Sequence, residues 1–138
     1  MIEWIQFLST FWMVCVIWFV QIVHYPLFLK INESTSRDYF KQHQFLISWI
    51  VLPAMILEAV SLLLLRAHNF NSIFWSLSFL LLILIWCSTF LVQVPIHRQL
   101  LNEPSQSLIK KLIYTNWIRT ILWTLKMGVV VTLLKGSL

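Results

Sequence analysis

The 138-residue sequence contains few charged residues and almost no glycine. Charged side chains make up 11% of the chain, against roughly 25% in soluble domains, whereas hydrophobic residues make up 59%. With only two glycines and four prolines, it has no low-complexity linker and no obvious internal repeat. The length and composition therefore predict a single domain of an integral membrane protein.

Cysteine and acidic residues are also scarce. The two cysteines, Cys15 and Cys87, lie within apolar runs and match no zinc or redox spacing, so we interpret them as small hydrophobic side chains. Five acidic residues against ten lysines and arginines give a net charge of +5. Because the basic residues are scattered singly, they form no patch of the kind that binds nucleic acid. We therefore expect no nucleic-acid partner.

Four stretches contain the approximately 20 mainly apolar residues that a membrane-spanning helix needs. They are residues 4–29, 45–65, 73–95 and 112–134. The first lacks the basic start and cleavage site of a signal peptide. Since the connections are short, neighbouring helices should pack antiparallel. The predicted fold is an all-α, antiparallel four-helix transmembrane bundle, a single four-span domain over residues 1–138 within the lipid bilayer. The sequence leaves open whether the protein forms a homo-oligomer, because it contains no clear small-residue motif for helix association.

The basic residues predict the orientation of the bundle. The first and third connections should be cytoplasmic and both termini outside, because six basic residues lie on the first side and two on the other: Lys30, Arg37, Lys41, Arg98, Lys110 and Lys111 against Arg66 and Lys135. Ser36 is the expected N-cap of the second helix, which places His43 on an ordered turn. His68 should be a solvated loop residue.

Six polar or ionisable side chains lie inside the predicted spans, and two histidines lie at their edges. They are His24, Glu58, Gln93, Asn116, Arg119 and Lys126, with His43 and His97 at the edges. Such groups cost a few kcal/mol each to bury in hydrocarbon, so they normally face a bundle interior. At a rise of about 1.5 Å per residue, all but Glu58 and Lys126 fall in one layer near the cytoplasmic side. Glu58 and Lys126 lie deeper, at a shared level, and predict a structural ion pair.

The shallower layer predicts a polar pocket. His24 could act as general base on an acidic phenol or enol, while Gln93, Asn116 and Arg119 stabilise the resulting oxyanion. His43 and His97 would complete the mouth or hold a cofactor. Kinks at Pro26 and Pro95 should splay the helices there and open the cavity.

The histidines leave the cofactor open. His24, His43 and His97 are candidate ligands for a transition metal, and two of them could hold a haem axially. No helix carries HxxxH or ExxH spacing, so the sequence contains no strong metal motif. A mechanism without a cofactor is equally compatible with these residues.

Two motifs resemble a known family. The third span ends in Val94-Pro95-Ile96-His97-Arg98-Gln99-Leu100, and the fourth contains Asn116-Trp117-Ile118-Arg119-Thr120. Together with Tyr25-Pro26-Leu27-Phe28, this pairing resembles the four-helix membrane family that includes the fungal anthrone oxygenases and many uncharacterised bacterial proteins. The resemblance implies a membrane oxygenase for a polycyclic phenolic or other lipophilic substrate, with Asn116 and Arg119 functional. At position 97 this sequence has His where the family usually has Asn, and it adds His24 and His43.

The sequence therefore predicts a membrane oxidoreductase or oxygenase-like enzyme with a cytoplasm-facing pocket for a lipophilic phenolic or quinone-like molecule. Two alternatives remain. A small proton-coupled transporter would use the intramembrane carboxylate of Glu58. An accessory subunit of a larger membrane complex would use the bundle chiefly for contact with partners.

Overall fold

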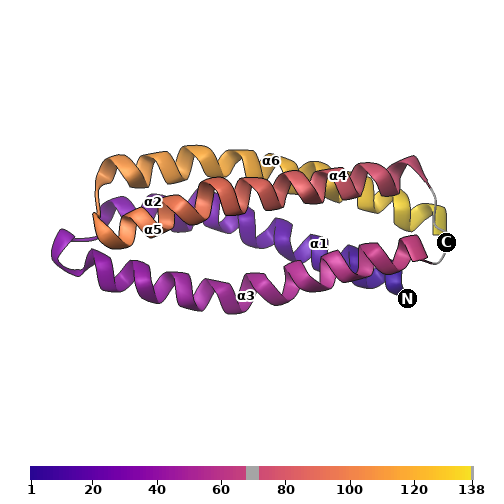
Figure 1. The fold of residues 1–138 in the computed structure, drawn as a ribbon, viewed down its shortest axis with the longest axis horizontal. Coiled ribbons are helices and arrows are strands. Elements are labelled where there is room, and N and C mark those ends of the chain that lie inside the picture. Colours follow the sequence, from indigo (N-terminus) through magenta and orange to yellow (C-terminus); the bar gives the residue numbers. More distant parts are fainter. Residues whose placement is uncertain (68–71, 138) are drawn as a thin grey trace.

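The computed structural model describes residues 1–67 and 72–137, and every regular element in these two ranges is helical (Figure 1). The prediction for His68 lies outside the described residues. The first span consists of α1, η1, α2 and η2: Ile2–Phe19, Val20–His24, Tyr25–Leu27 and Phe28–Lys30. The second is α3, Glu33–Ala67. The third consists of α4, η3 and α5, and the fourth is α6: Ile73–Ser88, Thr89–Gln93, Val94–Asn102 and Gln106–Ser137.

The four predicted spans are confirmed as helices long and apolar enough to cross a membrane. Their continuous segments are Ile2–Lys30, Ser36–Ala67, Ile73–Asn102 and Gln106–Gly136. The prediction that Ser36 caps the second helix is wrong, because α3 already begins at Glu33. Asn32, a residue type favoured at N-caps, precedes that start. The helix nevertheless begins well before the apolar run, so His43 lies on an ordered turn as expected.

The helices pack as an antiparallel bundle with uneven contacts. α1 packs along both α3 and α6, and α4 packs along α6. By contrast, α3 contacts the third span at only a few residues of α4 and more extensively at α5. Both termini lie at one end, which we call the terminal end (Figure 1). The opposite end carries the connections at residues 31–32 and 103–105 and holds α2 and α5; we call it the two-loop end.

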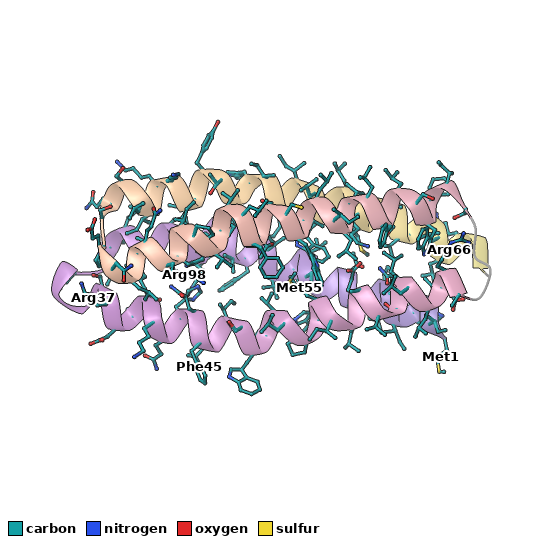
Figure 2. The ribbon with its side chains drawn as sticks, in the orientation of Figure 1. Met1, Arg37, Phe45, Met55, Arg66 and Arg98 are labelled. Atoms are coloured by element: carbon teal, nitrogen blue, oxygen red, sulfur yellow. The ribbon has the colours of Figure 1, made fainter. Side chains whose placement is uncertain are left out.

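The outer surface of the bundle is strongly apolar. Phe45, Trp49 and Leu91 are 64%, 69% and 73% exposed, and Figure 2 shows Phe45 pointing away from the other helices. Met13 and Trp123 lie in the interior with no exposed surface. An apolar exterior of this extent is unusual for a soluble monomer and suits contact with lipid.

Two short π-helical segments interrupt the first and third spans. η1 (Val20–His24) is followed directly by Tyr25-Pro26, and η3 (Thr89–Gln93) by Val94-Pro95. A proline ring clashes with the carbonyl four residues earlier in an α-helix, and a wider turn relieves that clash. In the sequence, Pro26 and Pro95 are separated by half the length of the 138-residue chain, and the two π segments have the same sequence separation. The first and third spans therefore repeat one backbone geometry, which the sequence pattern did not reveal.

Candidate functional site

A ladder of polar side chains joins the first span to α6 near the two-loop end. The Gln21 side chain donates from Nε2 to the Ile113 carbonyl at 3.1 Å and accepts from Asn116 Nδ2 at 2.8 Å. Asn116 Oδ1 in turn accepts from Arg119 Nη1 at 3.2 Å. Thr120 lies in contact with the same Gln21 oxygen at 3.5 Å. All four side chains are buried, so the ladder fixes the position of the Arg119 guanidinium.

The three predicted histidines gather in the same layer. His24 Nε2 and His43 Nδ1 share a hydrogen bond of 2.8 Å. His97 Nε2 is bonded to the Tyr25 hydroxyl at 3.0 Å, and the rings of His43 and His97 are 5.9 Å apart between centroids. The structure thus brings the residues of three spans together, as the depth argument predicted. Tyr25 belongs to the same cluster through its bond to His97, although the sequence predicted no role for it. Its position directly after His24 was the feature that could have indicated one.

A cavity of about 330 Å³ lies between the helices beside these groups, and it opens to the outer surface at Leu52 and Phe90, which are 51% and 52% exposed. Tyr25, Gln93, His97 and Arg119 line it together with apolar side chains of the first three spans and with four further polar residues, Gln44, Ser48, Thr89 and Arg98. We call it the central cavity. Its volume falls at the lower end of the roughly 300–1,000 Å³ typical of small-molecule sites.

Several buried atoms beside the central cavity have no hydrogen-bond partner within the described part of the chain. They are Gln93 Oε1, His97 Nδ1 and Arg119 Nε. Gln93 is 2% exposed and Arg119 is 7% exposed, so bulk water does not satisfy them. Leaving such a group unpaired costs about 1–3 kcal/mol. Because these atoms have no accessible surface, a polar ligand would recover that free energy only if their side chains turn toward the cavity.

The predicted site residues divide between two cavities. Gln93, His97 and Arg119 line the central cavity, whereas His24 and His43 line a separate groove between α1 and α3. Asn116 lines neither cavity. Its Oδ1 accepts a hydrogen bond from Arg119 Nη1 and so holds the guanidinium in place. His24 is therefore placed away from the oxyanion-stabilising group it was expected to serve, and the imidazole that shares a cavity with Arg119 is that of His97.

The histidines do not fit a shared metal or haem in this arrangement. Among residues 1–67 and 72–137, no group of three histidine, cysteine or acidic side chains is placed to hold a metal ion. The bonded nitrogens of His24 and His43 are 2.8 Å apart, whereas two nitrogens bound opposite each other at about 2.0 Å from one metal are about 4 Å apart. The remaining imidazole, that of His97, is already bonded to Tyr25 through Nε2.

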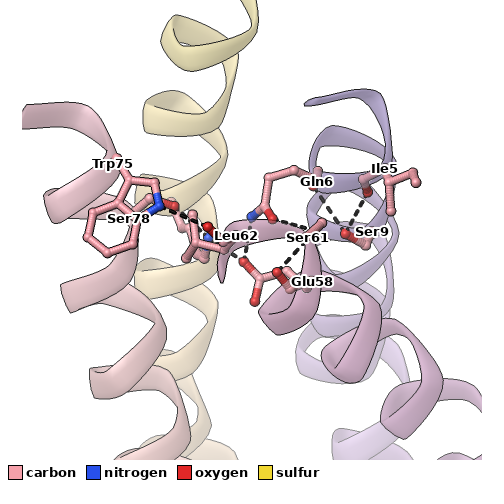
Figure 3. Close-up of polar contacts among 9 residues, drawn as sticks. Ile5, Gln6, Ser9, Glu58, Ser61, Leu62, Trp75 and Ser78 are labelled. Carbon is pink, nitrogen blue, oxygen red and sulfur yellow. Dashed lines mark hydrogen bonds and ion pairs between the residues drawn. The ribbon is translucent and has the colours of Figure 1, made fainter. Parts of the chain in front are cut away.

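A second polar network lies toward the terminal end (Figure 3). Glu58 and Lys126 form the predicted ion pair, and both side chains are completely buried. Gln6 Nε2 donates to Glu58 Oε1 at 2.8 Å, and Lys126 Nζ donates to Ser78 Oγ at 2.7 Å. Ser61 bonds the Gln6 oxygen at 2.6 Å. Four different spans therefore meet in this network, of which the sequence reasoning identified only the charged pair.

Comparisons with protein-family models, with curated proteins and with solved structures found no match. The resemblance to the anthrone oxygenase family stays a prediction.

Proposed function

We propose that the central cavity binds a lipophilic phenol, enol or quinone-like molecule, and that the protein is an oxidoreductase or oxygenase-like enzyme of the membrane. The observation that carries this proposal is the state of Arg119. Its guanidinium is always charged and 7% exposed, yet none of the ion pairs among the described residues joins it to a carboxylate. A buried cation without a counter-charge favours an anionic or strongly polarised oxygen in the adjoining cavity.

The Tyr25–His97 pair supports proton transfer from such a ligand. If His97 Nε2 carries the proton and donates to Tyr25, its unpartnered Nδ1 is unprotonated, and the ring must turn to present this buried atom to the ligand as a base. If Tyr25 donates instead, the pair accepts a proton through the tyrosine hydroxyl, which passes its own proton to Nε2. Either tautomer leaves the ligand oxygen negatively charged near Arg119, while Gln93 offers an acceptor for a second hydroxyl. The base role expected of His24 passes in this proposal to His97.

The oxygenase-like part of the proposal rests on the family resemblance. Deprotonation makes a phenol or enol electron-rich, and dioxygen can then oxidise a ring CH₂ group to a carbonyl with release of one water. The atoms of this step balance without a further reductant. Haem or metal is not required, and the histidines offer neither a ready site.

The proposal is tested with anthrone, a tricyclic ketone with a phenolic tautomer, added to purified protein in nanodiscs. Binding is followed by fluorescence titration, and turnover by dioxygen consumption. Arg119→Gln should weaken anthrone binding roughly 10- to 100-fold, the range for losing a hydrogen bond to a charged group. Arg66→Gln is the matched control, because Arg66 stacks on Trp75 in the part of α3 near the terminal end. Unchanged binding in Arg119→Gln would overturn the proposal.

The proposed orientation places the two-loop end in the cytoplasm and both termini outside, on the strength of the basic residues in the two connections. Single cysteines in a Cys15→Ser/Cys87→Ser background test it. Ile73→Cys, at an exposed position near the terminal end, should react with a membrane-impermeant maleimide in intact cells. Gln106→Cys, exposed at the two-loop end, should react only after permeabilisation. The reverse pattern would invert the topology.

A further inference from the structure

A second and larger cavity lies between α1 and α3, on the other side of the seam formed by Val16, Val20 and Ile47. Its volume is about 630 Å³. Phe19, Leu46 and Ile50 at its border are 58%, 53% and 45% exposed, so it opens along the outer surface of the bundle. We call it the α1–α3 groove. Since the outer surface suits contact with lipid, the groove would open sideways into the bilayer.

The groove is elongated and polar at one end only. Its lining extends over residues 12–24 of the first span and 39–50 of α3, which at about 1.5 Å per residue corresponds to roughly 16–18 Å. The polar lining residues, His24, Tyr39, Gln42 and His43, all lie toward the two-loop end. The rest of the lining is hydrocarbon, aromatic ring or thiol. Such a shape matches a single long chain with a polar head.

His24 supplies the head contact. Its half-buried side chain lines the groove, and its Nε2 is bonded to His43 Nδ1 at 2.8 Å. Within the described residues the His24 ring makes this one hydrogen bond, so its Nδ1 is a donor in one neutral tautomer and an acceptor in the other. His43 Nε2 also lacks a partner, but it has no accessible surface, so a head group in the groove does not reach it. A hydroxyl satisfies both tautomers, and a carbonyl satisfies the first. The described residues that line the groove include no lysine, arginine or carboxylate, so nothing there selects a charged head.

We propose that the α1–α3 groove is a binding site for a single-chain lipid with an uncharged hydroxyl or carbonyl head, of the long-chain or isoprenoid alcohol and alkyl-quinone class. The head bonds to His24 at the two-loop end, and the chain lies along α1 and α3 toward the middle of the bundle. The ligand enters sideways from the bilayer. This site is separate from the central cavity and does not depend on the function proposed for it.

The test uses hexadecanol that carries a diazirine within its chain and a terminal alkyne, incorporated into phosphatidylcholine nanodiscs with the full-length protein. After illumination, cross-linked peptides are located by mass spectrometry. Cross-links should concentrate on residues 12–24 and 39–50. Excess unlabelled hexadecanol should displace them, and hexadecane, which has the chain without the head, should not. Equal displacement by hexadecane would overturn the proposal, because it would show an apolar crevice without head recognition.

Variants sharpen this result. Cys15→Trp fills the groove and should remove most cross-links, whereas Cys87→Trp, in an entirely apolar groove between α3 and α4, should not. His24→Phe removes the head contact and should weaken displacement by hexadecanol about three- to tenfold. Cross-linking of equal intensity in the α3–α4 groove would show non-selective lipid coating and overturn the proposal. Arg119→Gln should leave the cross-links unchanged while weakening anthrone binding, so the two proposals can fail separately.

Discussion

The Glu58–Lys126 pair gives the most quantitative prediction, because both partners are completely buried at 0% exposure. Replacing Lys126 with Met keeps a chain of similar length and removes the charge. Glu58 then retains a bond from Gln6 at Oε1, while its Oε2 has no partner among the described residues. The variant thus leaves an uncompensated carboxylate in the middle of four packed helices.

Breaking one side of a buried ion pair typically costs about 3–5 kcal/mol. Insertion scales give a similar cost of about 2.5–3.5 kcal/mol for an unpaired charge at the centre of a membrane helix. We therefore expect Lys126→Met to lower the free energy of unfolding by about 3 kcal/mol or more. Glu58→Gln should do the same, because it leaves the buried ammonium without a counter-charge, with only neutral acceptors such as Ser78 Oγ beside it. The double variant Glu58→Gln/Lys126→Met removes both charges and keeps an amide beside Gln6, so it should recover to within about 1 kcal/mol of the wild type.

Reversible unfolding in mixed micelles, followed by circular dichroism and by the fluorescence of the eight tryptophans, measures these free energies. Lys135→Met is the control, since Lys135 is exposed and should change stability by less than about 0.5 kcal/mol. If Lys126→Met unfolds like the wild type, the pair does not hold the bundle together. If the double variant is as unstable as the sum of the single variants, the two charges are not coupled. Either result would refute the reasoning and would strengthen a transport role for Glu58.

Three further changes test the bundle and its central cavity. Ser72→Ala removes the side chain that accepts from the Trp75 amide at 3.1 Å; the free energy of unfolding should fall by about 0.5–2 kcal/mol in the same micelle assay, and a change smaller than the error would show that the cap is dispensable. Pro95→Ala removes the proline ring that the wide turn of η3 accommodates, so Gln93 should rotate out of the central cavity. Anthrone should then bind roughly tenfold more weakly, while the helix content measured by circular dichroism stays unchanged. Wild-type affinity would contradict the link between the π segment and the cavity. Asn116→Ala frees Arg119 Nη1 and should weaken anthrone binding by about two- to tenfold, less than Arg119→Gln; an effect as large as that of Arg119→Gln would mean that Asn116 itself contacts the ligand.

The architecture was predictable because a bilayer allows few solutions. A spanning helix must satisfy its own backbone and present about 20 apolar residues, so four such runs with short connections leave an antiparallel bundle. The depth of the ion pair was predictable for a related reason. Glu58 and Lys126 lie on α3 and α6, which the structure shows as single α-helices, so a constant rise per residue places them at one level.

The division of the polar layer into two cavities was not predictable in this way. In a regular α-helix successive side chains are related by a constant angle, but η1 and η3 each contain a wider turn. Every side chain at or beyond such a turn points in a different direction from the one that an α-helical count gives. His24 is the last residue of η1, and it faces the α1–α3 groove instead of Arg119. The prolines indicated a bend, but no sequence rule gave the direction of these side chains.

The repeated π segments explain why the two cavities have different chemistry. In each half of the chain, the last residue of the segment bonds to the helix that follows it: His24 to His43 at 2.8 Å, and Gln93 to Thr115 at 2.9 Å. The backbone therefore aims an equivalent side chain at an equivalent neighbour in both halves, because Pro26 and Pro95 impose the same wide turn. The difference lies in the residues that occupy these positions. In the first half, the two imidazoles of His24 and His43 face the α1–α3 groove. In the second half, the bond between the Gln93 amide and the Thr115 hydroxyl leaves Gln93 Oε1 without a partner beside Arg119. Of the two cavities, only the central cavity therefore combines an unpaired acceptor with a fixed positive charge.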